Sequence, residues 1–191
     1  RLQRLILSDE QEEKLVDVNP PTFSNVYVDQ KGIKYTTSHG ENISNLKKHN
    51  TDGSSSIDTN WGIDLALVDV YTDDQGIIYA ASDDGYIFIL TSDGQFVFGL
   101  GTQSDQNVVG FYSQLTSIAV DSNGKIWTID QDNAFLQSYT PTDYSNRIYN
   151  ALTLYKLGKY EEAVAEWEEV LKLNQLSVLA HREIGRNLFS Q

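Results

Sequence analysis

Three aspartates recur at matched places in this 191-residue sequence and are the first candidates for chemistry. Asp29, Asp73 and Asp121 each open an Asp-x-x-Gly segment. A carboxylate at such a place could act as a general acid or base, or could hold a divalent cation. A catalytic site, however, brings different residues to one point, whereas a repeat places the same residue once in every copy. We therefore interpret these aspartates as turn residues whose side chains accept hydrogen bonds from nearby backbone N–H groups.

A second matched set could face a common axis. Asn25, Asp69 and Ser117 occupy one position of the repeat, where oxygen atoms could bind a metal ion. A hard cation takes about six oxygen ligands, and a serine hydroxyl is a poor ligand, so we expect no metal centre here. Asp83-Asp84 and the run 130–133 (Asp-Gln-Asp-Asn) resemble parts of calcium loops, but they lack the twelve-residue spacing with a terminal Glu. Simple turns are the preferred interpretation, a weak surface site for Ca²⁺ is the open alternative, and we expect no other cofactor.

The other chemistry-bearing residues define no site. The histidines, His39, His49 and His181, lack ligand spacing, and the absence of cysteine excludes thiolate nucleophiles and cysteine-bound zinc. These observations lean away from an enzyme. The net charge of −13 would repel a phosphate backbone, so we expect no nucleic-acid partner. The sequence has no run of about 18 apolar residues, so we expect no membrane span in this chain.

A repeat positions these residues. Residues 23–37, 67–81 and 115–129 align without a gap, 44 and 48 residues apart. Each copy has an alternating apolar run, then Asp-x-x-Gly, then a second run with an aromatic residue. A repeat of roughly 40–50 residues built from strands is typical of β-propeller blades, each a four-stranded antiparallel meander. The expected fold is multidomain β + α, with a partial propeller of about three blades followed by an antiparallel helical hairpin.

The sequence divides into three parts. Residues 1–21 are predicted to form an N-terminal helical segment, because Ser8 and Gln11 match a capping box and two prolines end it. Residues 22–141 are predicted to form the partial propeller, with blades at about 22–62, 63–102 and 110–141. The third blade has three predicted strands, and we expect its fourth to come from residues upstream of Arg1, since such closure removes a sheet edge. A start at Arg1 and the absence of methionine favour a fragment or a processed product.

The last part, residues 142–191, is predicted to be helical because the apolar period changes from two to 3.6. Its spacing of Gly, aromatic, Ala and aromatic resembles a tetratricopeptide repeat, and a small residue recurs 34 residues further on. The residues that carry this resemblance are Gly158, Tyr160, Ala163 and Trp167, with Ala151 and Gly185 as the recurring small residues.

The β part resembles propellers built from NHL repeats. The run 110–139 carries the similarity, with Gly-Phe, an apolar-Ala-Val-Asp strand, Asn-Gly and a later Asp-x-x-Asn motif. An NHL-like propeller followed by tetratricopeptide repeats is similar to bacterial proteins described as gluconolactonase-like. The resemblance implies an extracytoplasmic or membrane-anchored protein beside membrane transport components. It is a likeness of fold, and it implies no lactonase chemistry by itself.

Two functions stay open on the sequence alone. The first is a non-enzymatic protein-interaction or scaffold module of a bacterial cell-envelope protein, in which the helical groove holds a protein or peptide partner. The residues that match the groove positions of the repeat are Ser145, Ile148, Leu152, Tyr155 and Lys156. The alternative is the C-terminal part of a lactonase-like, metal-dependent hydrolase whose site lies mostly upstream. Blade faces left uncovered would also favour self-association of the chain.

Overall fold

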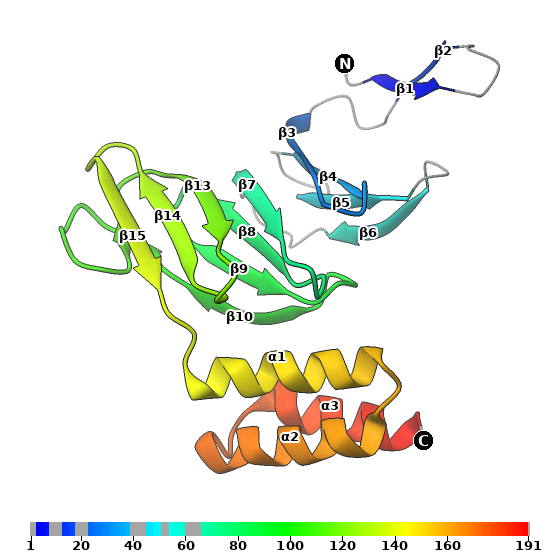
Figure 1. The fold of residues 1–191 in the computed structure, drawn as a ribbon. Helices are drawn as coiled ribbons and strands as arrows, with labels where there is room; N and C mark the ends of the chain where they lie inside the picture. The colour runs from blue at the N-terminus through cyan, green and yellow to red at the C-terminus, as the bar shows by residue number, and fades with distance from the viewer. Residues whose placement is uncertain are drawn as a thin grey trace. The chain divides into compact units, whose positions relative to one another are not determined.

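The computed structural model describes residues 3–7, 13–17, 23–38, 45–50, 54–59 and 66–190 (Figure 1). The chain divides into two compact units. The first consists of residues 1–119 with 127–137, and the second of residues 120–126 with 138–191. The first unit holds most of the strands and the second holds the helices.

Two four-stranded antiparallel sheets match the first two predicted blades. The first sheet contains β3 (Phe23–Val28), β4 (Lys34–Ser38), β5 (Leu46–His49) and β6 (Ser55–Thr59), in that order. The second contains β7 (Leu67–Thr72), β8 (Ile78–Ser82), β9 (Ile87–Leu90) and β10 (Phe96–Leu100), also in sequence order. Each is a meander of the kind that makes one propeller blade.

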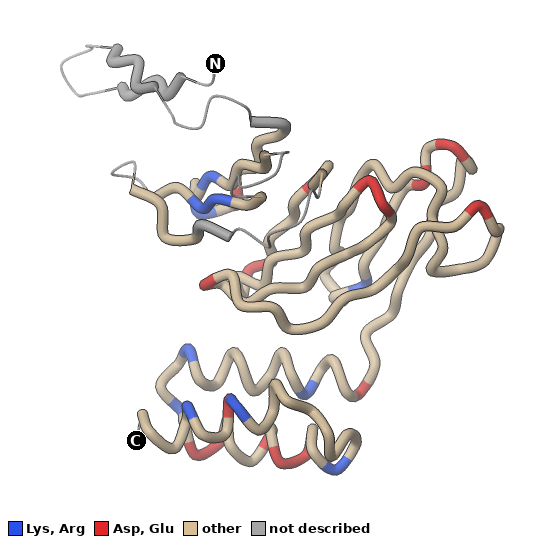
Figure 2. Tube along the Cα trace, turned by 180° about the vertical axis from the view of Figure 1, so that it is seen from behind, with Lys and Arg blue, Asp and Glu red and all other residues tan. Residues whose placement is uncertain are grey.

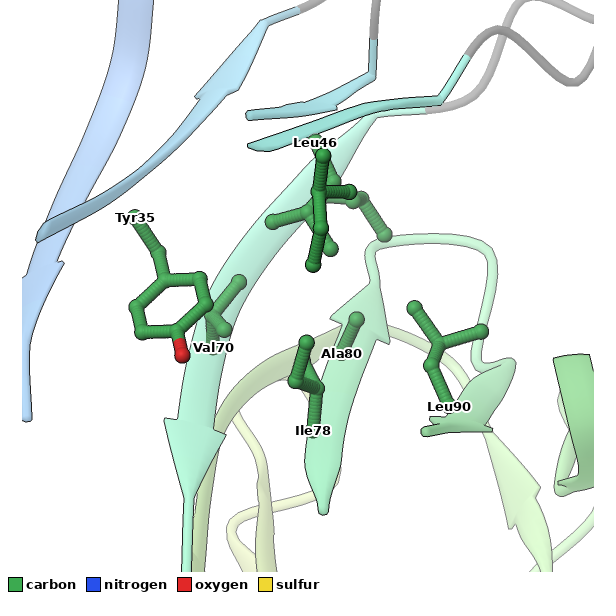
Figure 3. Packing of buried hydrophobic residues seen from close by; sticks show 8 residues of the cluster. Tyr35, Leu46, Val70, Ile78, Ala80 and Leu90 are labelled. Atoms are coloured by element: carbon green, nitrogen blue, oxygen red, sulfur yellow. The ribbon is translucent and has the colours of Figure 1, made fainter. Parts of the chain in front are cut away.

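The two sheets share one apolar core (Figure 3). Tyr35, Leu46 and Ile57 of the first sheet are buried in one cluster with side chains of the second, which are Leu67, Val70, Ile78, Ala80 and Leu90. Burial of these faces stabilises the pair by roughly 25 cal/mol for each Å² of apolar surface removed from water.

The third sheet has the three strands that the sequence predicts. Its order is β13 (Leu115–Val120), β14 (Ile126–Asp130) and β15 (Phe135–Tyr139). A short parallel pair that the sequence does not predict precedes it, formed by β11 (Thr102–Gln103) and β12 (Phe111–Tyr112). Two glycines lie close together beside this pair, since a Cβ on Gly101 would lie 2.3 Å from the carbonyl oxygen of Gly85.

The helix expected over residues 1–21 is wrong. The structure has two strands there, β1 (Gln3–Leu7) and β2 (Glu13–Asp17), which pair in antiparallel register with Leu5 opposite Leu15. Two short apolar runs separated by a polar segment satisfy each other's backbone groups as a hairpin, and this outweighs the local capping pattern. The capping residues Ser8 and Gln11 lie outside the described residues.

Three helices follow the third sheet, as the change of period predicts. They are α1 (Asp143–Lys156), α2 (Tyr160–Leu173) and α3 (Val178–Phe189). A capping box formed by Thr142 and Ser145 starts α1. Gly158 follows its C-cap with a φ of 75°, which is the predicted glycine termination. The helices bury small and aromatic side chains: Ala151, Ala163, Trp167, Val170 and Ala180.

Candidate functional site

The recurring aspartates are turn residues, as predicted. The Oδ1 atom of Asp29 accepts hydrogen bonds from the backbone N–H groups of Lys31 and Ile33 at 2.9 and 2.8 Å. Asp121 accepts from N–H groups two and four residues further along the chain at 2.8 and 3.1 Å, and Asp73 accepts from Ile77 N–H at 2.8 Å. Burial raises the pKa of Asp73 despite these hydrogen bonds. Each of the three carboxylates therefore stabilises the turn of its own hairpin, and the three turns are separate.

The second matched set links neighbouring blades. Asp69 accepts hydrogen bonds at Oδ2 from the hydroxyl of Ser117 (2.8 Å) and from the N–H of Ile118 (3.0 Å) in the next sheet. Its Oδ1 atom accepts from the N–H of Val70 at 2.9 Å. Asn25 of the first sheet donates from Nδ2 to the carbonyl oxygen of Val68 in the second. Both carboxylate oxygens of Asp69 are thus engaged by donors within the chain, which is an arrangement for holding strands together.

Asp130, in the run that resembles a calcium loop, is fully buried. It accepts from the N–H of Ser113 at 2.9 Å and from the N–H of Gln114 at 3.3 Å. Asn133 donates to it from its backbone N–H and from Nδ2, at 3.2 and 2.9 Å. Burial would raise the pKa of Asp130, but these hydrogen bonds outweigh burial and lower it. The donors fix the loop after β14 to the chain before β13.

A row of tyrosines crosses from the first sheet to the second. Tyr27 lies 6.3 Å from Tyr35 and 6.0 Å from Tyr71 between ring centroids, and Tyr71 lies 6.3 Å from Tyr79. Lys48 Nζ lies 6.0 Å from the Tyr35 ring centroid, and burial raises the pKa of Tyr35 to about 12. Sequence analysis noticed only the recurring second aromatic. The alternating pattern of β3 and β7 could also have pointed to the aromatic residue in each of these strands, Tyr27 and Tyr71.

The histidines make local contacts. His49 Nε2 lies 2.7 Å from the hydroxyl of Thr36, and His181 Nε2 lies 3.0 Å from the carbonyl oxygen of Gln175. His39 lies outside the described residues. In the part of the chain that the structure describes, no three His, Asp or Glu residues form a group that could hold a metal ion.

The predicted helical groove residues differ in accessibility. Ser145 is engaged in the capping box, where its hydroxyl accepts from the N–H of Thr142 at 2.9 Å. Ile148 is fully buried, so its side chain is not available to a partner. Leu152 and Tyr155 are half-buried and Lys156 is exposed. These last three are the members of the predicted set that a partner could touch.

Tyr155 connects the three helices. Its ring centroid lies 5.4 Å from that of Tyr160 at the start of α2. The guanidinium carbon of Arg186 on α3 lies 4.6 Å from the Tyr155 centroid, a cation–π geometry. Arg186 also pairs with the buried Glu183, at 3.6 Å between Nη1 and Oε2. Sequence analysis did not identify Arg186, because its contact depends on how α3 packs against α1.

Exposed apolar side chains lie at both ends of α3. Leu176, Val178 and Phe189 are 87%, 80% and 94% exposed, and Leu188 is also exposed. Gly185 lies on the same helix, and nothing comes within 4 Å of a Cβ placed on it. In an amphipathic helix of a stacked repeat, such a face is where the next element packs. The apolar residues of 176–189 are evident in the sequence, but their exposure is known only from the way α3 packs.

Each of the three helices carries charged residues of both signs (Figure 2). The glutamates of α2 are its main charges, and three of them form ion pairs. Arg147 Nη1 lies 3.2 Å from Glu166 Oε2, and Lys159 Nζ lies 3.2 Å from Glu162 Oε1. The third pair joins Lys172 to Glu169. Of these three pairs, Arg147–Glu166 joins α1 to α2 and the other two are local to α2, and exposed pairs contribute roughly 0–1 kcal/mol each.

Comparison with known proteins identifies the class of fold. No model of a protein family matches the chain, and no curated protein matches it. Among solved structures, the extracellular domain of a hybrid two-component system from B. thetaiotaomicron matches 72% of this chain at 16% identity and a TM-score of 0.51, with 18% of its own length covered. A protein of unknown function from Bacteroides caccae matches 74% of this chain at 11% identity and a TM-score of 0.52, with 51% of its length covered. A structure described as a putative gluconolactonase matches 69% of this chain at 14% identity and a TM-score of 0.43, with 43% of its own length covered.

These matches indicate a β-propeller-like fold for the β part, and the three helices follow it in this chain. The β part of the expected fold is thereby confirmed, and the assignment of the helices to tetratricopeptide repeats stays a prediction. The chain covers 18% of the length of the two-component-system domain and 51% of the length of the Bacteroides caccae protein. No helix in the described residues is long and apolar enough to cross a membrane.

Proposed function

We propose that this chain is a non-enzymatic protein-interaction module, in which a β-propeller-like arc carries a helical platform of the tetratricopeptide type. The uncovered apolar surface of α3, together with Leu176 before it, carries this proposal. Large apolar side chains left exposed on one helix are typical of a surface that a partner or another element covers. We call this group, formed by Leu176, Val178, Leu188 and Phe189, the α3 surface.

The helical arrangement supports a repeat platform. Gly185 lies 34 residues after Ala151, and Ala151 is fully buried where α1 packs. The equivalent place at Gly185 is open, since an added Cβ would touch nothing. In a stacked repeat, an open face of this kind is where another element packs. Leu152, Tyr155 and Lys156 remain the candidate groove residues on α1.

The proposed partner is a protein or peptide, and the proposed setting is the bacterial cell envelope, beside membrane transport components. The apolar α3 surface fits an amphipathic segment, because such a segment can bury its own apolar face there. Arg182 and Arg186 on α3 both pair with Glu183, so they set no charge preference for this segment. The setting is proposed from the family resemblance.

The alternative of a lactonase-like metal hydrolase gains no support from the described residues. Asp69, the best oxygen ligand of the matched set, has both carboxylate oxygens engaged by donors of the chain. A metal ion there would have to displace three hydrogen bonds, two of which join neighbouring blades. We therefore do not propose catalysis for this chain. Lactone hydrolysis assayed during titration with divalent metals tests this point, and turnover would overturn it.

Self-association is a separate proposal. Val26 and Val28 of β3 are both about half exposed, as expected for the face of a blade that lacks a neighbour. Sedimentation of the purified chain over a range of concentrations tests this. A concentration-dependent dimer would support it, and a single monomeric species would overturn it.

Photo-crosslinking tests the proposed function. A photoreactive residue in place of Leu176 should capture a protein in cells that produce this chain, and mass spectrometry should identify it. Val109, which is 75% exposed in the first unit, is the matched control position. The captured protein should then bind the purified chain, and Phe189→Asp should weaken binding by about tenfold or more. Equal binding by Phe189→Asp and by the wild type would overturn the assignment to the α3 surface.

A further inference from the structure

The turn between β13 and β14 contains the one Asn-Gly pair of the sequence, Asn123-Gly124. Asp121 closes this turn. Its carbonyl oxygen accepts from the N–H of Gly124 at 2.9 Å, and its Oδ1 atom accepts from the N–H of Asn123 at 2.8 Å. Gly124 adopts a positive φ of 73°, which glycine reaches at little steric cost. The backbone nitrogen that follows Asn123 thus belongs to a residue without a side chain.

The side chain of Asn123 is exposed, and within the described part of the chain it has no hydrogen-bond partner. Asn133, which follows the next strand, is held instead, because its Nδ2 atom donates to Ser113 Oγ at 3.0 Å and to Asp130 Oδ2 at 2.9 Å. An amide held in this way stays in place. The amide of Asn123 is free to turn toward the nitrogen of the residue that follows it.

We propose that Asn123 is a site of spontaneous deamidation in the folded chain. The Gly124 nitrogen loses its proton to solvent base and forms a bond to Cγ of Asn123. The bond between Cγ and Nδ2 breaks, and ammonia leaves with a proton taken from water. Water then cleaves either C–N bond of the resulting cyclic imide: cleavage at Cγ yields aspartate, and cleavage at the main-chain carbonyl carbon yields isoaspartate.

Opening of the turn controls this reaction. The N–H of Gly124 donates to Asp121, so its nitrogen attacks only after this hydrogen bond has opened locally. The side chain of Asp121 keeps the turn closed by accepting from the N–H groups of Asn123 and Lys125. Weakening these hydrogen bonds should therefore make deamidation faster.

The site lies where a change of the main chain has an effect. Residues 120–126 belong to the second unit together with residues 138–191. Within this unit Gly124 lies against Pro141, since a Cβ placed on Gly124 would be 3.4 Å from Pro141 Cγ. Both products add a negative charge, and isoaspartate also lengthens the main chain of the turn by a methylene group. Deamidation therefore alters the turn against which the segment before α1 packs.

Peptide mass spectrometry of the full chain, incubated at neutral pH and sampled over time, tests the proposal. Asn107 is the internal control, because it is also exposed but precedes Val108, whose β-branched side chain crowds the attacking nitrogen. We expect Asn123 to convert about tenfold or more faster than Asn107, into both isoaspartate and aspartate. Asp121→Ala should raise the rate at Asn123 by about fivefold, and Asn123→Gln should abolish isoaspartate in this peptide.

Three results would overturn the proposal. The first is an equal rate at Asn123 and Asn107. The second is aspartate without isoaspartate, because the side-chain amide would then be hydrolysed directly. The third is an unchanged rate in Asp121→Ala that keeps the native circular dichroism spectrum; if this variant does not fold, the first two results decide. The separated isoaspartate form should also show faster amide hydrogen exchange in residues 120–126, and equal exchange would overturn the effect on the turn.

Discussion

The substitution Asp69→Ala tests how the blades are held together. Asp69 accepts three hydrogen bonds, two of them from the next sheet at 2.8 and 3.0 Å. A hydrogen bond to a charged group contributes about 1.5–3 kcal/mol, and removing its acceptor leaves N–H groups without a partner. Asp69 is half-buried, so water can replace part of this loss. We therefore expect Asp69→Ala to lower the free energy of unfolding by about 2–3 kcal/mol.

The assay combines urea unfolding with hydrogen exchange resolved by peptide. Exchange should accelerate in β7 and β13, which Asp69 joins, and should stay unchanged in the helices. Asp74→Ala is the matched control, because it removes an exposed aspartate from the adjacent turn. It should change stability by less than about 0.5 kcal/mol. If Asp69→Ala and Asp74→Ala were equally stable, the blade link would contribute nothing, and this reasoning would be refuted.

Three further predictions test other parts of the structure. Gly101→Ala should lower the free energy of unfolding by about 3 kcal/mol or more, because its Cβ would meet the carbonyl oxygen of Gly85. Gly32 has a similar positive φ, but a Cβ placed on it would touch nothing, so Gly32→Ala should lower the free energy of unfolding by only about 1 kcal/mol. Equal losses of stability in the two variants, measured by urea unfolding, would contradict the close approach of Gly101 to Gly85. The lowered pKa of Asp130 contributes stability that is present above its unfolded pKa, near 3.8, and is lost as pH falls through the folded value below that. Asp130→Asn should therefore flatten the acid unfolding curve below about pH 4, and an unchanged curve would show that another group titrates. Gly185→Ala should stabilise the helices by about 0.5–1 kcal/mol in thermal unfolding, and a loss would show that something packs there.

The repeat made most of the sheet structure predictable. The sequence pattern predicts strands at 67–72, 77–81, 86–90 and 95–100. β7 has these bounds, and β8, β9 and β10 each begin one residue later than predicted. This works because period-two alternation and Asp-Gly turns are local signals. The sequence predicts a helix over residues 1–21, where the structure has the paired strands β1 and β2. Short apolar runs fit the helical period of 3.6 residues as well as the strand period of two. β11 and β12 are too short to leave a pattern.

The candidate site was less predictable because its contacts are long-range. Alignment placed Asn25, Asp69 and Ser117 at one repeat position, but their partners lie in the next blade, up to 49 residues away. Their role as blade links depends on the twist between sheets, which the sequence does not display. The burial of Ile148 and the contact of Arg186 with Tyr155 likewise depend on helix packing. Residue types and spacing therefore located the candidates without giving their partners.

Binding at the α3 surface is the central claim, and calorimetric titration with the crosslinked and purified partner tests it most directly. The wild-type chain should bind with a measurable enthalpy and a defined stoichiometry. Phe189→Asp and Val178→Asp should each bind about tenfold or more weakly, while keeping the wild-type unfolding curve because both side chains are mostly exposed. Unchanged affinity in both variants would contradict the claim.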